Sequence, residues 1–530
     1  MDKVIEPKKI KRIAPLIFVL LTEVVIGLFW FKETHSFLYL LLVAFILLAT
    51  VCIYYLTRFS RHALKKRGDV DVAYLFALIF SLLVFTFAFP PFSSPDELHH
   101  FYSSYWITDA FLGESDLSSG DFLISLDTNQ FASDMMDSAQ EGEGIYDIGQ
   151  KTYRELGDWL TSPRTNRKKI EVNEYDFSVG SENLPAKLGS VGGVLLARLL
   201  DLSPVALFYA GRIGSAVFYL LIVYSAYKII PRCKSIIMIP TLLPMSLHLA
   251  ASYSYDSGII ALSFLLIALL LKIVLTDDYL GPADIALLVV VSTLLAPCKV
   301  VYAPIILLIV LVPSSRFRTK REMLIVKAAV LFCMTASVLA VRSASMGALA
   351  SEGGSLDYRG SESGHFYSLS MLISQPVMTV KLFIRTFYTF GDFYLSSMVG
   401  GILGWLQQDI SIPMFFIFLY VLVAIVVVIA DCHGVRFSFS FKLGMACVFV
   451  LSVLGSMLSM CLGHTFNTEL VIMGVQGRYF LPVVPLALIL IGSNCINLSL
   501  ERPLRFGLNA TVFLNSLNIL SVIGMCLTLP

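Results

Sequence analysis

The residues whose types and order are best suited to chemistry follow an apolar segment near residue 90: Ser94-Pro95-Asp96-Glu97-Leu98-His99-His100. This order is typical of a helix start, with Ser94 as N-cap, Pro95 in the first helical position and Glu97 closing a capping box. A cap uses a single carboxylate, so one of the two neighbouring acids has no structural task. The segment therefore predicts a helix start that also carries a spare carboxylate.

Asp96 would share one face of that helix with His99 and His100, because residues three and four positions apart are neighbours on a helix. A carboxylate beside an imidazole can act as a general base, and paired carboxylates can bind a divalent cation such as Mg or Mn. We therefore take Asp96, Glu97, His99 and His100 as candidate catalytic residues, with Asp96 and Glu97 as candidate metal ligands. Capping and solvation alone explain the segment equally well.

Three further charged residues lie within or at the ends of apolar segments: Arg212, Asp256 and Lys299. An ionisable group inside a membrane is costly, so it usually faces a cavity or pairs with another charge. All three are candidates for binding a charged substrate. The simpler explanations are that Asp256 and Lys299 reach the membrane edge and that Arg212 forms a buried structural ion pair.

The last candidate is the polar start of a late apolar segment: Gln476-Gly477-Arg478-Tyr479-Phe480-Leu481-Pro482. Arg478 could bind a phosphate by bidentate contact, with Gln476 and Tyr479 beside it. Arginine and aromatic side chains are also typical anchors at the level of the lipid headgroups. The spacing favours neither explanation.

Membrane spans are the elements that must position these residues, because the chain has membrane composition. Its 530 residues are 57% hydrophobic and 15% charged, with a mean hydropathy of +0.78, whereas soluble domains have about a quarter charged residues. The nine cysteines show no zinc-ligand spacing and no disulfide framework. A P-loop, a dinucleotide fingerprint and a His-Glu-x-x-His motif are all absent from the sequence, and a chain of net charge +1 is not expected to bind nucleic acid.

Runs of about 20 apolar residues indicate transmembrane helices. Thirteen are predicted, at 13–31, 37–56, 72–90, 205–228, 235–252, 258–275, 284–297, 300–313, 325–342, 412–430, 443–461, 479–496 and 510–528. The first is too long for a signal-peptide core and lacks a cleavage site, so we expect it to be retained. The short pair at 284–297 and 300–313 could also be one broken span.

The basic residues predict the orientation, because short cytoplasmic loops are rich in Lys and Arg. They cluster at the N-terminus and at residues 58–67, 232–234, 316–321 and 502–505. Threading thirteen spans from a cytoplasmic N-terminus places every cluster in the cytoplasm and leaves three segments outside: 91–204, 343–411 and 462–478. The sequence therefore predicts a multi-pass protein of the cell membrane with its candidate site on the outer face.

Three parts are predicted along the chain: an N-terminal transmembrane hairpin with its basic loop (1–71), a core with the outer loop 91–204 and the outer segment 343–411 (72–496), and a C-terminal transmembrane helix (497–530). Within the outer segments, an amphipathic pattern predicts an interfacial helix at 95–112. The segment 186–202 is expected to form an interfacial or re-entrant helix instead of a span, and the segment 376–393 is expected to be similar. The polar stretch 113–184 between the first two of these is expected to form a small soluble excursion.

Several of these segments together resemble the bacterial membrane-protein family catalogued as domain of unknown function 2142, which is similar to the GT-C class of glycosyltransferases. The matching residues lie at 90–101, 243–257, 393–405 and 476–482. The chain departs from the family's usual pattern, which has a small residue and a single histidine after Asp-Glu, because it has Leu98 and two histidines. Its two spans before residue 72 are also additional to those of the simplest form of the fold.

The resemblance implies an all-α, GT-C-like bundle that transfers a sugar from a polyprenyl-phosphate donor to an envelope glycan or lipid acceptor, with inversion. Asp96 or Glu97 would act as the base or hold a divalent cation, and Arg478 with Lys299 or Arg212 would bind the leaving phosphate. Membrane lipids would contact the apolar spans. The alternatives are a polysaccharide polymerase or ligase, a transporter or flippase of lipid-linked glycans, and a non-catalytic envelope partner.

Overall fold

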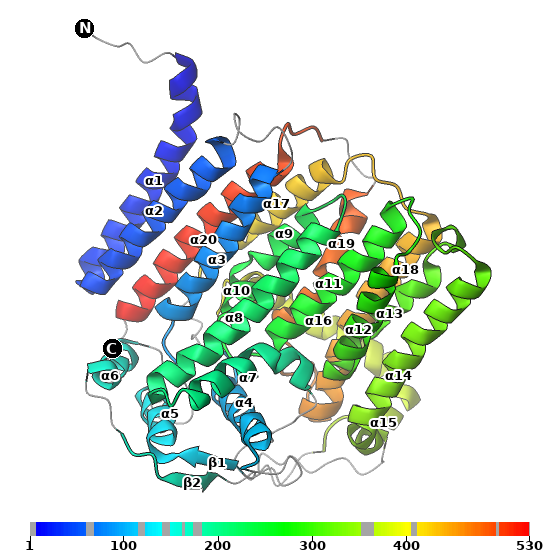
Figure 1. Cartoon of the computed structure of the whole chain (residues 1–530), viewed down its shortest axis with the longest axis horizontal. Coiled ribbons are helices and arrows are strands. Elements are labelled where there is room, and N and C mark those ends of the chain that lie inside the picture. Colours follow the sequence, from blue (N-terminus) through cyan, green and yellow to red (C-terminus); the bar gives the residue numbers. More distant parts are fainter. Residues whose placement is uncertain are drawn as a thin grey trace.

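The computed structural model describes residues 7–59, 68–114, 122–139, 149–161, 165–172, 183–350, 365–403, 411–493 and 498–528. Nine helices among these residues are long and apolar enough to cross a membrane: α1 (Pro7–Thr34), α2 (Phe37–Phe59), α3 (Gly68–Ala88), α8 (Pro204–Ile229), α11 (Asp256–Leu275), α14 (Lys320–Ala350), α17 (Met414–Asp431), α18 (Phe439–His464) and α20 (Pro503–Thr528). They form one bundle in Figure 1. The predicted all-α polytopic membrane protein is confirmed.

The other four predicted spans are helical but short or broken. They are α9 (Ser235–Thr241) with α10 (Pro244–Ala250), α12 (Pro282–Cys298), the run of η3 (Val300–Tyr302), α13 (Pro304–Leu307) and η4 (Leu308–Leu311), and η6 (Gly477–Val483) with α19 (Val484–Gly492). Each of these segments contains proline, which lacks the N–H that continues a helix. The sequence therefore overestimated the number of long spans, since hydropathy does not register these interruptions.

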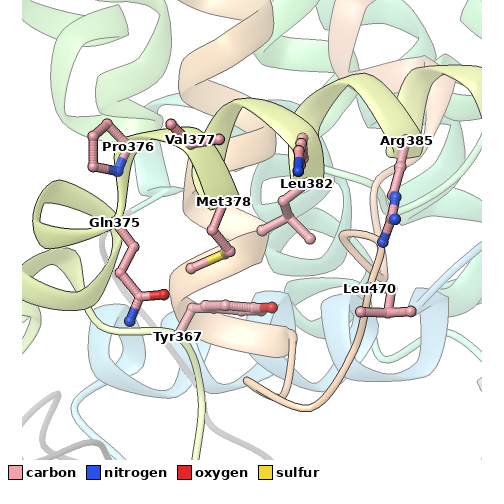
Figure 2. Close-up of a pocket in the computed structure, with 9 residues that line it drawn as sticks. Tyr367, Gln375, Pro376, Val377, Met378, Leu382, Arg385 and Leu470 are labelled. Carbon is pink, nitrogen blue, oxygen red and sulfur yellow. The ribbon is translucent and has the colours of Figure 1, made fainter.

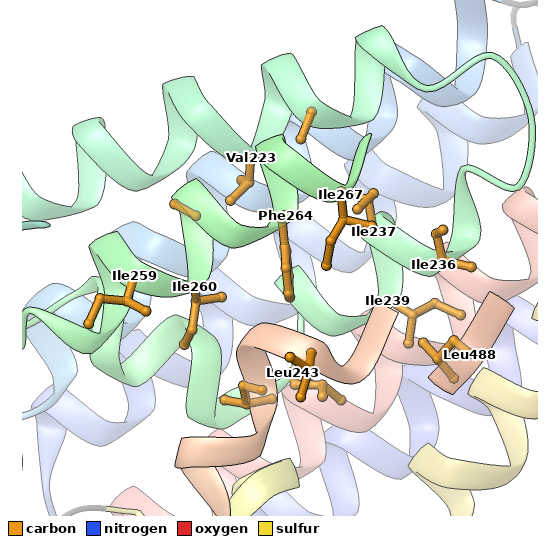
Figure 3. Close-up of a cluster of buried hydrophobic side chains, with 14 of the residues drawn as sticks. Val223, Ile236, Ile237, Ile239, Leu243, Ile259, Ile260, Phe264, Ile267 and Leu488 are labelled. Atoms are coloured by element: carbon orange, nitrogen blue, oxygen red, sulfur yellow. The ribbon is translucent and has the colours of Figure 1, made fainter. Parts of the chain in front are cut away.

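Helix α11 lies at the centre of the core, and 83% of its apolar window is buried. Figure 3 shows Phe264 and Ile267 of α11 packed beside Ile237 of α9, with Leu243 between α9 and α10 nearby. A helix that is apolar on every side is stable only when other helices cover it completely. Because α11 is held in this way, its first residue, Asp256, has a fixed position at one end of the bundle.

The two ends of the bundle carry different charged clusters. At one end, Asp71 of α3 contacts Lys228 at 2.7 Å and Lys234 at 3.4 Å, and Arg316 in the short helix η5 (Ser314–Arg316) pairs with Asp277 after α11. Asp256 lies at the opposite end of α11. The clusters predicted at 232–234 and 316–321 therefore share one end of the bundle, whereas the side chains at 1–12 and 58–69 lie outside the described residues.

A second, smaller core lies beside the site end of the bundle. It joins α4 (Glu97–Leu112), α5 (Leu126–Ala139), α6 (Gln150–Thr161) and a two-stranded antiparallel sheet of β1 (Phe122–Ser125) and β2 (Lys169–Val172), in which Phe122 pairs with Val172. Its centre is aromatic: Phe101, Trp106, Phe131, Trp159 and Phe208. The excursion predicted at 113–184 is thus packed against the bundle in its described parts; residues 115–121, 140–148, 162–164 and 173–182 lie outside them.

Helix α4 corrects the prediction of an interfacial helix over 95–112. Every residue from His100 to Asp109 is buried, so the helix has no lipid-facing side along that stretch. Arg198 of α7 (Leu184–Leu199) holds it from one side, with its guanidinium 2.6 Å from the carboxylate of Asp109. The apolar residues that suggested an interfacial face instead contribute to the second core.

Helix α7 packs very closely along the first half of α8, where glycines face each other. A Cβ on Gly193 would lie 2.1 Å from the carbonyl oxygen of Ala210, and one on Gly189 would lie 2.5 Å from that of Gly214. Small residues allow two helix backbones to approach in this way. Gly189 and Gly193 therefore serve packing, and this packing leaves the buried Lys187 on the inner side of α7.

The segment around 376–393 forms α16 (Pro376–Val399), which follows the short helix α15 (Leu369–Ser374). One face of its first half is apolar and exposed: Val377, Val380, Ile384, Phe387 and Tyr388. This pattern agrees with the predicted interfacial helix. The C-terminal half packs against η6, where a Cβ on Gly477 would lie 1.8 Å from the carbonyl oxygen of Tyr394.

Candidate functional site

Glu97, the first residue of α4, is fully buried and pairs with Arg212 of α8. The Arg212 Nε donates to Glu97 Oε1 at 2.9 Å, and Nη2 donates to Oε2 at 2.7 Å. The backbone N–H groups of Tyr253 and Ser94 donate to the same carboxylate at 3.3 Å and 3.4 Å. Such a bidentate pair with additional donors offsets the large cost of burying two charges.

The remaining N–H groups of Arg212 bind the end of α3. Nη1 donates to the carbonyl oxygens of Thr86 at 3.2 Å and Phe89 at 2.8 Å, and Nη2 donates to that of Pro90 at 2.8 Å. Carbonyls at a helix end lack helical partners. Because every nitrogen of the guanidinium is engaged, the buried structural ion pair is the explanation of Arg212 that its contacts support.

The predicted N-cap at Ser94 is wrong. The residue that precedes α4 is Asp96, whose backbone is left-handed, with φ 55° and ψ 21°. Aspartate tolerates this conformation better than most residues. The Ser94 hydroxyl lies 3.0 Å from His248 Nε2 instead of capping the helix. Only the reciprocal half of the capping box is found, the Ser94 N–H contact with the Glu97 carboxylate. Because of the turn at Asp96, α4 begins at Glu97, two residues after the predicted start at Pro95.

Asp96 differs from its neighbour in being open to its surroundings. Its side chain is 55% exposed, and its nearest described charge is Arg478 of η6, with Nη2 3.7 Å from Oδ2. Asp96 makes no side-chain cap to α4. Of the two acids, Asp96 is therefore the one whose carboxylate remains accessible to another molecule.

Arg478 connects Asp96 to a second carboxylate deeper in the bundle. Its Nε lies 3.3 Å from Oδ2 of Asp256, and Lys299 donates to Oδ1 of the same residue at 3.0 Å. The side chains of Arg478 and Asp256 are 5% and 12% exposed. Four of the residues singled out in the sequence, from four separate segments, thus form one continuous chain of contacts: Asp96, Arg478, Asp256 and Lys299.

The guanidinium of Arg478 retains unused donors. Its Nη1 is buried and has no hydrogen-bond partner in the described part of the chain, whereas its Nε has only the 3.3 Å ion contact with Asp256. A buried N–H without a partner is unfavourable, and the two ion contacts at 3.3 Å and 3.7 Å are longer than those of Arg212. Arg478 is therefore equipped to bind an additional anion.

Two aromatic rings enclose the lysine side of this cluster. Lys299 Nζ lies 4.3 Å from the ring centre of Tyr479 and 5.5 Å from that of Tyr255. The Tyr302 hydroxyl donates to the Tyr479 carbonyl at 2.6 Å and fixes the backbone next to Arg478. Tyr479 is thus part of the cluster, whereas Gln476 is half-buried and contributes a backbone carbonyl to η6.

Lys187 lies beside the cluster although its sequence context did not predict a site residue. Its side chain is 3% exposed and donates to the Ser103 hydroxyl, and its Nζ lies 5.7 Å from the ring centre of Tyr255, the ring that also contacts Lys299. Burial lowers the pKa of Lys187 to about 8. Lys187 was hidden because segment 186–202 was interpreted as an interfacial helix, in which a lysine would reach water.

The two histidines lie beside this cluster. The His100 ring packs on Tyr255 with centroids 4.8 Å apart, and its Nδ1 has no partner among the described residues. Burial, followed by nearby Lys187, lowers the pKa of both imidazoles, while Asp96 partly opposes this for His99. Both rings are therefore neutral at pH 7, and neither adds to the positive charge of the cluster.

A divalent cation bound by Asp96 and Glu97 together does not fit these contacts. Both oxygens of Glu97 are occupied by protein donors, and the remaining carboxylate, Asp96, faces the positive charge of Arg478. Within the described residues, no three His, Cys, Asp or Glu side chains gather as metal ligands would. We therefore derive no step through a metal.

The charges of the cluster leave an excess of positive charge. Lys299 and Arg478 contact the two carboxylates of Asp96 and Asp256, and Lys187 adds a further positive charge near the Tyr255 ring, while Arg212 is neutralised by Glu97. An excess cation in a poorly hydrated site favours an anionic ligand. The arrangement can hold a negatively charged group at Arg478, within reach of the exposed Asp96 carboxylate.

Comparison with known proteins gives a family but no characterised relative. No curated protein and no solved structure is significantly similar to this chain. The model of the family described as "Predicted membrane protein (DUF2142)" matches residues 78–487, which cover the site and most of the bundle. The family resemblance expected from the sequence is thereby confirmed. The chain belongs to the DUF2142 family of predicted membrane proteins.

Proposed function

We propose that this membrane protein is a glycosyltransferase that moves a sugar from a polyprenyl-phosphate donor to an envelope glycan or lipid acceptor on the outer face of the cell membrane. The observation that carries the proposal is the contact between the exposed Asp96 and Arg478, whose spare donors suit a phosphate. A lipid-linked donor agrees with a site at the end of a membrane bundle. The resemblance to GT-C enzymes supplies the reaction type.

In the proposed reaction, the acceptor hydroxyl oxygen forms a bond to the anomeric carbon of the donor sugar. The bond between that carbon and the phosphate oxygen breaks, and polyprenyl phosphate leaves with the electron pair. The hydroxyl proton passes to the Asp96 carboxylate. A single displacement of this kind inverts the anomeric configuration.

Arg478 would bind the leaving phosphate, on which negative charge increases in the transition state. Lys299 and Lys187 contribute positive charge, because both ammonium groups lie within about 6 Å of the ring centre of Tyr255, at 5.5 Å and 5.7 Å. Asp256 would act as a positioning residue, because it contacts both Lys299 and Arg478. Glu97 has no direct role in the proposed reaction, since Arg212 occupies both of its oxygens.

A comparison of envelope glycans tests the proposal. Cells that lack the protein should lose a defined sugar from an envelope glycan or glycolipid, and the wild-type gene should restore it. Asp96→Asn should fail to restore it although the protein reaches the membrane in normal amount, because the acceptor proton then has no base. A matched control is Asp158→Asn, which changes an exposed acid on α6 and should restore the sugar fully.

The size of the missing component distinguishes the related functions. Loss of one sugar residue supports a transferase, whereas loss of an entire polysaccharide chain from its acceptor contradicts it and supports a polymerase or ligase. Unchanged glycans, or full restoration by Asp96→Asn, would also contradict the proposal.

A further inference from the structure

A pocket of about 520 Å³ lies under the first half of α16, away from the Asp96 cluster. Figure 2 shows Gln375 and Arg385 at opposite ends of the pocket, with Tyr367 facing α16 across it. Lys381 of α16 and Leu470 also line it. The lining therefore combines two cations and an amide with apolar side chains.

The two cations of the pocket have no described acidic partner. Lys381 and Arg385 are exposed, and neither forms an ion pair with a described carboxylate. They are four residues apart, so they lie on the same side of the helix one turn from each other. The Tyr367 hydroxyl donates to the carbonyl of Glu469 at 2.7 Å, which leaves its oxygen able to accept only. The pocket thus presents two cations that form no ion pair with a described carboxylate.

The apolar face of α16 indicates the nature of the missing partner. Val377, Val380 and Ile384 are 68%, 58% and 63% exposed, and they share the face next to Lys381 and Arg385. An exposed apolar stripe flanked by cations is typical of a helix at the boundary between hydrocarbon and headgroups. A ligand of this pocket would therefore have an anionic head beside apolar chains.

The pocket is separate from the proposed catalytic site. Lys381 precedes Tyr394, one of the residues of α16 that contact η6, by 13 residues, which is roughly 20 Å along a helix. Arg478 therefore cannot share a single phosphate with Lys381 and Arg385.

We propose that this pocket binds the phosphate headgroup of an anionic phospholipid, with Lys381 and Arg385 contacting the phosphate and the acyl chains lying along the apolar face of α16. Anionic phospholipids match the charge of the pocket, and zwitterionic ones match it less well because their own cation competes with the two side chains. Bound lipid would hold α16 at the membrane boundary and thereby support the packing of η6 on its C-terminal half.

Native mass spectrometry of the full chain, released from nanodiscs of equal parts phosphatidylglycerol and phosphatidylcholine, tests this site. The wild-type protein should retain phosphatidylglycerol at least tenfold more than phosphatidylcholine. Lys381→Gln with Arg385→Gln should reduce that preference at least fivefold, whereas Lys381→Arg with Arg385→Lys should keep it. The matched control Lys151→Gln with Lys168→Gln removes the same charge from two exposed sites elsewhere and should also keep it.

Three outcomes of the lipid comparison would each overturn the proposal. They are equal retention of both lipids by the wild-type protein, an unchanged preference in the Lys381→Gln, Arg385→Gln variant, and an equal loss in the control. Displacement of phosphatidylglycerol by millimolar inorganic phosphate would also overturn it, because the pocket would then recognise a free anion. If the double variant does not fold, Lys381→Gln alone provides the test and should reduce the preference about threefold.

Discussion

Two neighbouring acids of this protein each face an arginine, and the two contacts differ in every respect that matters for chemistry. Glu97 and Arg212 are buried, bidentate and 2.7–2.9 Å apart, with all donors engaged. Asp96 and Arg478 are 3.7 Å apart, the acid is exposed, and the arginine has spare donors. In the Glu97–Arg212 pair every donor has a partner, as expected of a structural ion pair. In the Asp96–Arg478 pair donors remain without a partner, as expected of a binding site.

The comparison shows why adjacent residues of similar type need not share a role. The left-handed turn at Asp96 ends the loop after α3, and the next residue already belongs to α4 and points into the bundle. The Glu97–Arg212 pair stabilises the fold because its charges are fully compensated. The Asp96–Arg478 pair has unused capacity, so we expect it to act by binding another molecule.

The largest effect is expected from Arg212→Met, which leaves the buried Glu97 without its partner and the end of α3 without three donors. We expect a loss of about 3–5 kcal/mol in the free energy of unfolding, measured by denaturant unfolding in micelles. Adding Glu97→Gln to Arg212→Met should lower the free energy of unfolding little further, because both changes remove the same ion pair. A loss below about 1 kcal/mol in the single variant would contradict a stabilising role for the Glu97–Arg212 pair.

A smaller effect is expected from Arg478→Lys, which keeps the charge but removes the planar fork. Glycosyl transfer should fall about tenfold to a hundredfold, equivalent to roughly 1.4–2.7 kcal/mol, with little change in stability. Rates measured at saturating and limiting donor separate binding from the chemical step. Arg436→Lys, at an exposed position away from the site, is the matched control. Equal rates for the two variants would show that Arg478 does not contact the donor.

The smallest effect concerns Lys187, whose pKa is lowered to about 8 by burial. In the unfolded chain the pKa of this lysine is about 10.4. Between about pH 8 and about pH 10.4 the unfolded chain therefore binds more protons than the folded protein, and the free energy of unfolding rises with pH. Between pH 7 and pH 9.5 the wild-type protein should therefore gain about 2 kcal/mol relative to Lys187→Met. Thermal unfolding of both proteins at the two pH values measures this gain, and parallel pH profiles would contradict it.

Much of the fold was predictable because hydropathy is a local property of the chain. The nine long helices each correspond to a predicted apolar run, and the alternating threading correctly placed Asp256, Lys299 and Arg478 at one end of the bundle. The number of crossings between these residues predicted only that they lie at the same end, and it left their contacts open. The four broken segments were harder to foresee, because proline interruptions lower hydropathy very little.

The contacts inside the site were less predictable, because they depend on how each helix is rotated about its axis. Nothing in the spacing of Glu97 and Arg212 shows that α8 turns this arginine toward the start of α4. Lys187 escaped notice for the same reason, since only the close glycine packing of α7 on α8 brings it inside. The two acids of the motif could not be ranked until the left-handed conformation of Asp96 was known.

The central claim is that Asp96 carries out the chemistry whereas Glu97 maintains the fold. It is tested most directly by measuring glycosyl transfer per folded molecule for Asp96→Asn and Glu97→Gln, with folded protein quantified in the same samples. We expect Asp96→Asn to lose at least a hundredfold in rate at wild-type stability, and Glu97→Gln to lose folded protein while each folded molecule stays within about threefold of the wild-type rate. A hundredfold loss per folded molecule in Glu97→Gln, with Asp96→Asn active, would contradict the account.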